Sequence, residues 1–411
     1  MKLVDYSLSK SKSWAVIGLT IALGSVLGVT AYRAYHKWQP EHLAKKARVF
    51  IGKGDYSNAT LLARRALQMA PSNADASRIM AETTEKYRMP ESVFWLQHLV
   101  DIEKKFADKV ALVAAALQFG QIPVAQETLR RFTDAEKNTG EYHASAAAVA
   151  MVSKKFAEAE REYETASKLD PKNDSYLFNR AMAQFQLPGR QAEAQATMEK
   201  LRDSNTLGAN ARRALVKYFL ATNQTPQALA RSKELQSNPD ANVNDRVNYL
   251  DLLQRTKSPK FAETLKKYQT DAAAKPGDVN TILGWMNASG MAADAIKWTA
   301  TLPPETTSSP VVSAPLAACY RATKDWAGLD ALVRDANWGE LEYLRLAFFA
   351  LTLRQEGDEN GFRARWNAAM TTGAKRPDAV RKLAQLGLAW GWEDEVRDLL
   401  WIVAEDSKDP N

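Results

Sequence analysis

The chain has 411 residues, 45% of them hydrophobic, and a formal net charge of +7. This length exceeds the roughly 250–300 residues at which single cores stop growing, so several domains or a repeat array are expected. The single cysteine, Cys319, excludes an internal disulfide framework and a metal site built from cysteines.

The positive charge is concentrated at the N-terminus. Residues 1–53 contain nine Lys or Arg and two acidic residues, which leaves 46 residues of each sign after position 53. A nucleic-acid-binding protein carries a basic stripe on its folded part. Because the remainder of this chain is neutral, we expect no nucleic-acid partner. The basic excess is instead suited to anionic lipid headgroups.

An uncharged run of 19 residues extends from Trp14 to Tyr32. As a helix it would be about 28 Å long, close to the roughly 30 Å hydrocarbon core of a bilayer. Aromatic residues at both ends suit the two membrane interfaces. We therefore predict a basic tail over residues 1–13, a transmembrane anchor over 14–32 and a basic juxtamembrane linker over 33–39.

Three features of this segment leave alternatives open. Val29-Thr30-Ala31 is an acceptable signal-peptidase site, although the apolar run is longer than a usual signal-peptide core. Three basic residues precede the run and six follow it, which favours a cytoplasmic large domain, but a tail with three lysines is itself awkward to translocate, so the side stays unresolved. Gly24 and Gly28 have the spacing that lets two anchors pack as a homodimer, although glycine is common in membrane helices.

Two segments after residue 40 share a pattern. They read GDYSNATLLARRALQMAP (residues 54–71) and KKFAEAEREYETASKLDP (residues 154–171). Each has an aromatic residue, a small residue three positions later, Ala seven positions beyond that and Pro five further on. Self-similarity at a fixed period indicates a repeat architecture.

The small-residue position recurs in steps of 32 to 35 residues, mostly 34. Its members are Ala59, Val93, Ala125, Ala159, Ala194, Ala228, Ala262, Ala295, Leu329, Phe362 and Val396. Together with the positions twelve residues before and seven after, 32 of 33 positions are apolar, Gln269 being the exception. Chance at 45% hydrophobic content would give about 15.

The pattern predicts two antiparallel helices per unit, with the small residue where the second helix crosses the first. The chain resembles the tetratricopeptide repeat family over about residues 40–407, most strongly near Pro40 and Gly140 and only weakly after about residue 260. The resemblance implies an all-α solenoid, a right-handed superhelix of about eleven helix-turn-helix repeats. We expect repeats over 40–300, a Pro/Thr/Ser-rich joint over 301–310 and degenerate helical repeats over 311–407.

Catalytic and metal-binding motifs are missing from the sequence. The four histidines, His36, His42, His98 and His143, form neither HExxH nor HxxxH and have no cysteine partner. The sequence contains no P-loop, no GxGxxG after a strand and no GxSxG. We expect a protein that is not an enzyme and binds no metal or cofactor.

In the tetratricopeptide family the first helices of successive units line a concave ligand groove. The family's Lys/Asn clamp for C-terminal carboxylates is absent, although Asn179 lies near one of its positions. Basic residues on three consecutive first helices are candidates for binding an acidic segment. They are Arg180, Arg213, Lys217 and Arg246. A solvated or salt-bridged helix face is the alternative.

Eight of the eleven tryptophans lie in the last third of the chain: Trp285, Trp298, Trp326, Trp338, Trp366, Trp390, Trp392 and Trp401. They raise the alternative of a carbohydrate- or enzyme-associated binding module. Trp326 occupies the repeat position of Tyr56, however, which favours packing between helices.

The resulting hypothesis is a non-catalytic, membrane-anchored scaffold that binds peptide or helix segments of other proteins. The resemblance implies a place in an envelope assembly, secretion, pilus or polysaccharide machine.

Overall fold

The computed structural model describes residue 35 and residues 38–406, without the side chains of residues 398 and 403–406. The predicted anchor over 14–32, the basic tail before it and the Gly24–Gly28 pair lie outside the described residues. No helix in the described part of the chain has the length and apolar character of a membrane span. The described residues form helices and turns without a strand, which confirms the all-α prediction.

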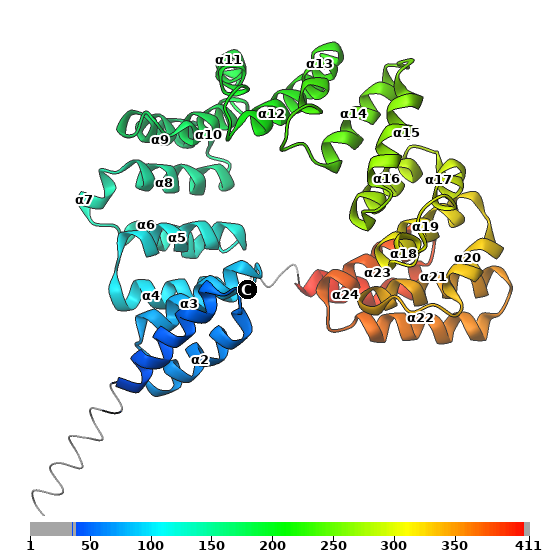
Figure 1. The fold of residues 1–411 in the computed structure, drawn as a ribbon, viewed down its shortest axis with the longest axis horizontal. Coiled ribbons are helices and arrows are strands. Elements are labelled where there is room, and N and C mark those ends of the chain that lie inside the picture. The colour runs from blue at the N-terminus through cyan, green and yellow to red at the C-terminus, as the bar shows by residue number, and fades with distance from the viewer. Residues whose placement is uncertain (1–34, 36–37, 407–411) are drawn as a thin grey trace, which may run out of the picture. The chain divides into compact units, whose positions relative to one another are not determined.

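The chain divides into two compact units, residues 1–191 and 192–411. The first unit contains a helix over residues 38–52. It is followed by α2 (Tyr56–Met69), α3 (Ala74–Lys86), α4 (Glu91–Glu103), α5 (Phe106–Gln118), α6 (Ile122–Arg130), α7 (Asp134–Lys137), α8 (Gly140–Val152), α9 (Phe156–Leu169) and α10 (Asp174–Gln184). Helices adjacent in sequence pack together, and α8 follows α5 as the next first helix (Figure 1). This is repeated hairpin packing, as predicted.

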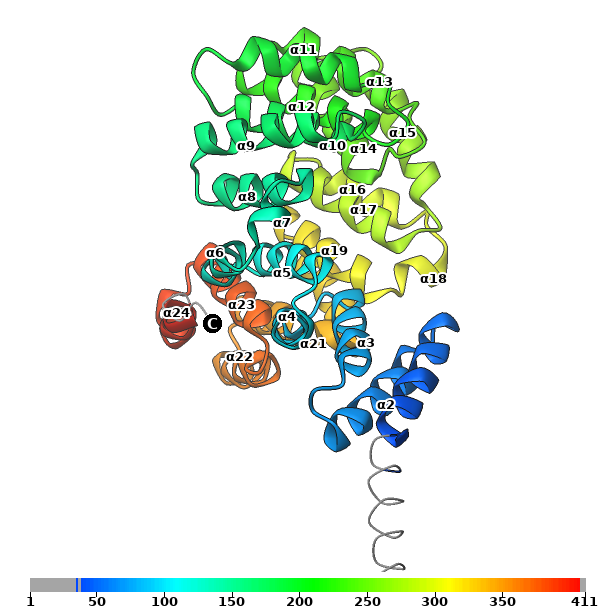
Figure 2. The same cartoon turned by 90° about the vertical axis from the view of Figure 1, so that its left-hand side faces the viewer.

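The second unit continues this arrangement. Its helices are α11 (Gln191–Leu201), which begins at the boundary, α12 (Gly208–Ala221), α13 (Thr225–Leu235), α14 (Val243–Arg255), α15 (Phe261–Ala272), α16 (Pro276–Ala288), α17 (Ala292–Thr299), α18 (Pro304–Thr307), α19 (Pro310–Thr323), α20 (Trp326–Val333), the short 3₁₀ helix η1 (Gly339–Leu341), α21 (Glu342–Gln355), α22 (Glu359–Gly373), α23 (Pro377–Ala389) and α24 (Glu393–Asp406). The first helices α14, α16 and α19 contact one another in order, and α17 also lies against α19 (Figure 2).

The segment 301–310, predicted as a joint, contains α18 and lies inside the second unit. Thr306 is 1% exposed, and its hydroxyl donates to the carbonyl of Ala273 at 2.9 Å. The segment is thus held against the preceding repeat. The boundaries predicted at 300 and 311 stay predictions.

The turns between helices are fixed locally. Gly54, at φ +75°, follows the first helix in a conformation that glycine adopts without steric cost. The carboxylate of Asp55 then accepts the backbone N–H of Asn58 at 3.1 Å and caps α2. The same turn before α9 has Lys154 at φ +58°.

The predicted helix-crossing positions are buried. Ala59, Ala125, Ala159, Ala228 and Ala295 are all 0% exposed. A side chain no larger than a methyl group lets the second helix approach the first closely. In the last hairpin the small residue moves to the first helix, because a Cβ on Gly387 would lie 2.1 Å from Cγ1 of Val396. In this hairpin the exchange makes room for Val396 in the position that a small residue occupies elsewhere.

One predicted position is wrong. Ala262 is exposed, whereas Leu265 and Ala272 of the same helix are 8% and 0% exposed. The buried repeat position of α15 is therefore Leu265, three residues after the position predicted from the repeat spacing. The shift also explains the polar exception: Gln269 is only half-buried, and Ala272 occupies the buried position seven residues after Leu265.

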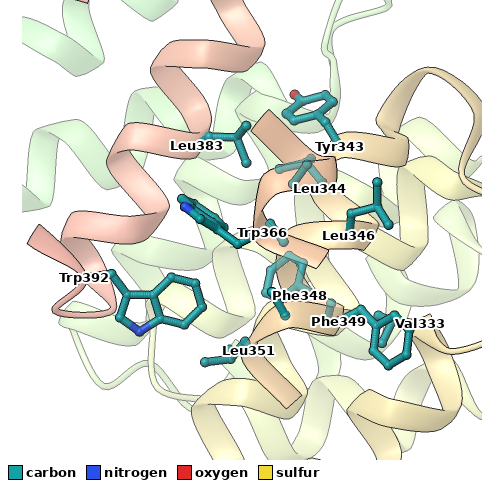
Figure 3. Packing of buried hydrophobic residues seen from close by; sticks show 14 of the residues in the cluster. Val333, Tyr343, Leu344, Leu346, Phe348, Phe349, Leu351, Trp366, Leu383 and Trp392 are labelled. Atoms are coloured by element: carbon teal, nitrogen blue, oxygen red, sulfur yellow. The ribbon is translucent and has the colours of Figure 1, made fainter. Parts of the chain in front are cut away.

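The C-terminal core surrounds α21. Every residue of this helix from Tyr343 to Leu353 is buried, and Phe348, Trp366 and Trp392 lie in its packing cluster (Figure 3). A helix buried on all sides cannot show a clear amphipathic period. That burial explains why the repeat pattern is weak here.

We predict that substitutions in the two registers differ in cost. Ala262→Leu should change the free energy of unfolding by less than about 0.5 kcal/mol, because the side chain is exposed. Ala295→Leu should destabilise by about 1–3 kcal/mol through overpacking. Urea unfolding followed by tryptophan fluorescence measures both. Equal costs would contradict the shifted register.

Acid should weaken the C-terminal core. The Arg345 guanidinium, 8% exposed, hydrogen-bonds the Glu342 carboxylate and lowers the pKa of that carboxyl from its usual 4.5. A lowered folded-state pKa contributes stability that is present above about pH 4.5 and is lost as the pH falls through the folded value. Tryptophan-detected urea midpoints should therefore fall on acidification, and Glu342→Gln should reduce that fall. An unchanged acid dependence in the variant would contradict this assignment.

Candidate functional site

A pocket of about 430 Å³ lies among α12, α13 and the beginning of α14. Its lining residues are Arg213, Val216, Lys217 and Leu220 from α12, Ser232 and Leu235 from α13, and Asn242, Asn244, Asp245 and Asn248 at the start of α14. It contains two of the cations predicted from the sequence. Asn179, Arg180 and Arg246 do not line it.

A capping box fixes the α14 edge of this pocket. The Asn242 side chain accepts the backbone N–H groups of Asn244 and Asp245 at 2.9 and 3.2 Å. The Asp245 carboxylate in turn accepts the N–H of Asn242 at 2.9 Å. Because these bonds satisfy free N–H groups at the helix start, α14 begins at a defined residue with its first polar side chains in fixed positions.

Arg213 is bound within the fold. Its Nε donates to Oδ1 of Asp245 at 2.9 Å and its Nη2 donates to Oδ2 at 2.8 Å. Further bonds run to the side chain of Asn210 and the carbonyl of Asp240. Asp245 is 4% exposed, and its hydrogen bond raises the pKa of Arg213. This pair connects α12 to α14, so a ligand carboxylate at Arg213 would compete with Asp245.

Three other polar side chains around the pocket are exposed: Lys217, Asn244 and Asn248. Within the described residues, no hydrogen bond or ion pair is found for the ammonium of Lys217 or for the side-chain amides of Asn244 and Asn248. Lys217 lies one helical turn after Arg213, and Asn248 lies one turn after Asn244. The pocket therefore presents one cation and two amides beside the apolar side chains of Val216 and Leu235.

Neither asparagine was predicted from the sequence. Lys217 lies on α12 and both amides lie on α14, so these residues do not follow the family's Lys/Asn clamp, in which a Lys and an Asn lie four residues apart. The available signal was the spacing Asn-x-x-x-Asn on the first helix that follows Arg213 and Lys217. That spacing places both amides on one helix face.

Arg246 packs inside its repeat. Its guanidinium lies 5.4 Å from the ring centroid of Tyr268 and 3.8 Å from the Asp271 carboxylate. Burial raises the pKa of Tyr268 to about 12. The geometry connects α14 to α15.

Arg180 is also held internally, in the first unit. Its Nε and Nη2 donate to one oxygen of Glu160 at 3.1 and 3.0 Å. Glu160 is 8% exposed and also accepts from Gln184 and Arg190. This network connects α9 to α10.

Asn179 lines a separate pocket of about 310 Å³ in the first unit, among α5, α8, α9 and α10. Its lining includes the exposed Ala114 and the half-buried Val110, Ala144 and Ala148. Small residues on α8 leave this depression shallow and apolar. No cation lines it.

The two described histidines outside the first helix line neither pocket. Nε2 of His98 lies 2.8 Å from the carbonyl of Pro71, and Nδ1 of His143 lies 2.6 Å from Glu162. Among the described side chains, no group of three or more His, Cys, Asp or Glu could hold a metal ion. Both histidines are accounted for by contacts between neighbouring helices.

No family model and no curated protein matches the chain. Solved structures of helical proteins are similar to it at low identity. The Pseudomonas aeruginosa pilF structure is 13% identical, covers 54% of this chain and 99% of its own, and has a TM-score of 0.39. A tetratricopeptide repeat protein from Parabacteroides merdae is 15% identical, with 69% and 99% coverage and a TM-score of 0.36. Yeast Tom70 is 11% identical, with 92% and 94% coverage and a TM-score of 0.36. These TM-scores are low, and the similarity assigns neither a family nor a function.

Alanine substitutions at Arg213 and Lys217 should differ in their effect on the free energy of unfolding, because Arg213 is paired within the fold and Lys217 is exposed. Removing Arg213 with Arg213→Ala leaves Asp245 buried without its partner. We expect a loss of at least about 1 kcal/mol, below the 3–5 kcal/mol of a fully buried pair, because the Arg213 side chain is 31% exposed. Lys217→Ala should stay within about 0.5 kcal/mol. Urea unfolding measures both variants, and equal losses would contradict the assignment.

Proposed function

We propose that the chain is a non-catalytic scaffold that binds an extended acidic segment of another protein in the α12–α14 pocket. The observation that carries this proposal is the set of three exposed polar side chains around the pocket, Lys217, Asn244 and Asn248, whose hydrogen-bonding groups the fold does not use. Arg213, by contrast, is bound to Asp245.

The pocket's chemistry suits a peptide. The ammonium of Lys217 offers three donors for a carboxylate, and charge-assisted hydrogen bonds of this kind are the strong ones. Each asparagine offers both donors and an acceptor, which match a peptide backbone. Val216 and Leu235 supply an apolar surface for one side chain.

We also propose that the repeats are of the tetratricopeptide type, with about eleven hairpins in a right-handed superhelix. The 34-residue spacing and the buried small residues at the crossings support this assignment. Arrays of this kind present long surfaces to partners without a fixed chemistry. Membrane attachment through residues 14–32 rests on the uncharged run in the sequence. An envelope assembly, secretion, pilus or polysaccharide machine is the proposed setting.

The alternative that the C-terminal third binds glycans through its tryptophans is weakened by their burial. Of the eight tryptophans between Trp285 and Trp401, only Trp401 is exposed. Trp338, Trp366 and Trp392 are 3%, 2% and 5% exposed and belong to the C-terminal core. Buried rings cannot stack on a sugar.

A displayed peptide library panned against the full chain tests the peptide pocket. Selected peptides should be acidic, and Lys217→Gln should weaken their binding by roughly tenfold or more, since a hydrogen bond to a charged group contributes about 1.5–3 kcal/mol. Asn248→Ala removes neutral hydrogen bonds of about 0.5–1.5 kcal/mol each and should weaken binding by at least a few-fold. Lys233→Gln, at an exposed lysine on α13, is the matched control and should have no effect. Selection of peptides without acidic residues, or equal losses at Lys233, would count against the pocket.

A further inference from the structure

The first described helix, over residues 38–52, has a wide exposed face. Its inner residues Ala44 and Ala47 are 1% and 0% exposed and pack in the core of the first hairpin. In α8, by contrast, only Glu141 and Val152, at the two ends, are exposed. The difference arises because no described helix precedes residues 38–52 to cover their outer side.

Exposed residues on this helix form a stripe opposite the core. At 100° per residue, positions 38, 42, 45 and 49 fall within about 60° of one another and on the far side from Ala44 and Ala47. The stripe consists of Trp38, His42, Lys45 and Val49, all exposed, and the exposed Lys53 follows in the turn after the helix. The Trp38 and His42 rings stack at 4.7 Å, and Trp38 and Val49 are 57% and 56% exposed. Lys46 lies at its edge.

The charge of this region differs from that of the rest of the chain. Residues 38–65 contain six basic and two acidic residues, whereas residues 66–411 contain 44 and 45. In the described part of the chain, no ion pair is found for Lys45, Lys46 or Lys53. An outward face with lysines around Trp and Val has the composition of helices that lie in a membrane interface.

We propose that this stripe rests on an anionic lipid surface and sets the orientation of the first repeats to the bilayer. Trp38 follows the end of the uncharged run at Tyr32 by six residues, a reach of at most about 20 Å. Trp38 can therefore lie among the headgroups, where tryptophan is favoured, with the lysines against anionic lipid. The inference rests on the proposed anchor and not on the peptide pocket.

A fluorescent label at Val49→Cys in the full chain tests the proposal. Cys319 is the only native cysteine and is buried, so the label reacts at position 49. Phosphatidylcholine vesicles containing phosphatidylserine and a headgroup-level nitroxide lipid should quench the label. Phosphatidylcholine vesicles with the same nitroxide should not, and salt should reverse the quenching. A label at Val152→Cys, 46% exposed on α8, is the positional control.

A second part of the same experiment removes the charges of three lysines in this region. Each basic residue near an anionic surface contributes about fivefold, so Lys45→Gln/Lys46→Gln/Lys53→Gln should lower the docked-to-undocked ratio about a hundredfold. The control Lys266→Gln/Lys267→Gln/Lys297→Gln removes three exposed lysines from the second unit and should have no effect.

Three outcomes overturn the inference. They are an unquenched label with phosphatidylserine, quenching that persists in the triple variant, and label-to-label contact without vesicles, which would indicate a second copy on this face. Flotation with neutral vesicles reports the anchor separately, and peptide binding in the same sample reports the pocket.

Discussion

The close crossing of paired helices is the constraint on which the described fold depends. A helical hairpin cannot bury both apolar faces alone, so stability comes from stacking neighbours. Stacking at short distance requires a small residue where the two helices of a hairpin cross. This residue lies on the second helix at Ala59 and Ala159 and on the first helix at Gly387. The pocket lies among three such helices, α12, α13 and α14, where Arg213 of α12 bonds Asp245 of α14.

Ion pairs with buried carboxylates join neighbouring helices. Arg213–Asp245 joins α12 to α14 and Arg180–Glu160 joins α10 to α9, and in both pairs the carboxylate is largely withdrawn from water. The planar guanidinium suits such sites because it can bond two acceptors at once. Arg213 and Arg180 are thus engaged within the fold, whereas no partner is found for Lys217 among the described residues.

Much of the fold could be predicted from the sequence because burial at helix crossings leaves a periodic trace. The prediction was wrong at Ala262 because α15 offers apolar residues at both 262 and 265, and hydrophobicity alone cannot choose between them. The trace fades around α21 because a helix buried on every side has no polar face. The pocket was only half predicted: Arg213 and Lys217 were identified, but the pairing that occupies Arg213 comes from Asp245, 32 residues away. Contacts of that kind depend on tertiary structure.

Photo-crosslinking in native membranes tests the central claim, that the free polar side chains of α12 and α14 form a protein-binding surface. A crosslinking amino acid at Asn248 in the full chain should capture one dominant protein, with the adduct mapping to an acidic segment. The same amino acid at Lys233 on α13 should capture none. Adducts of equal yield at both positions, or none at Asn248, would contradict the account.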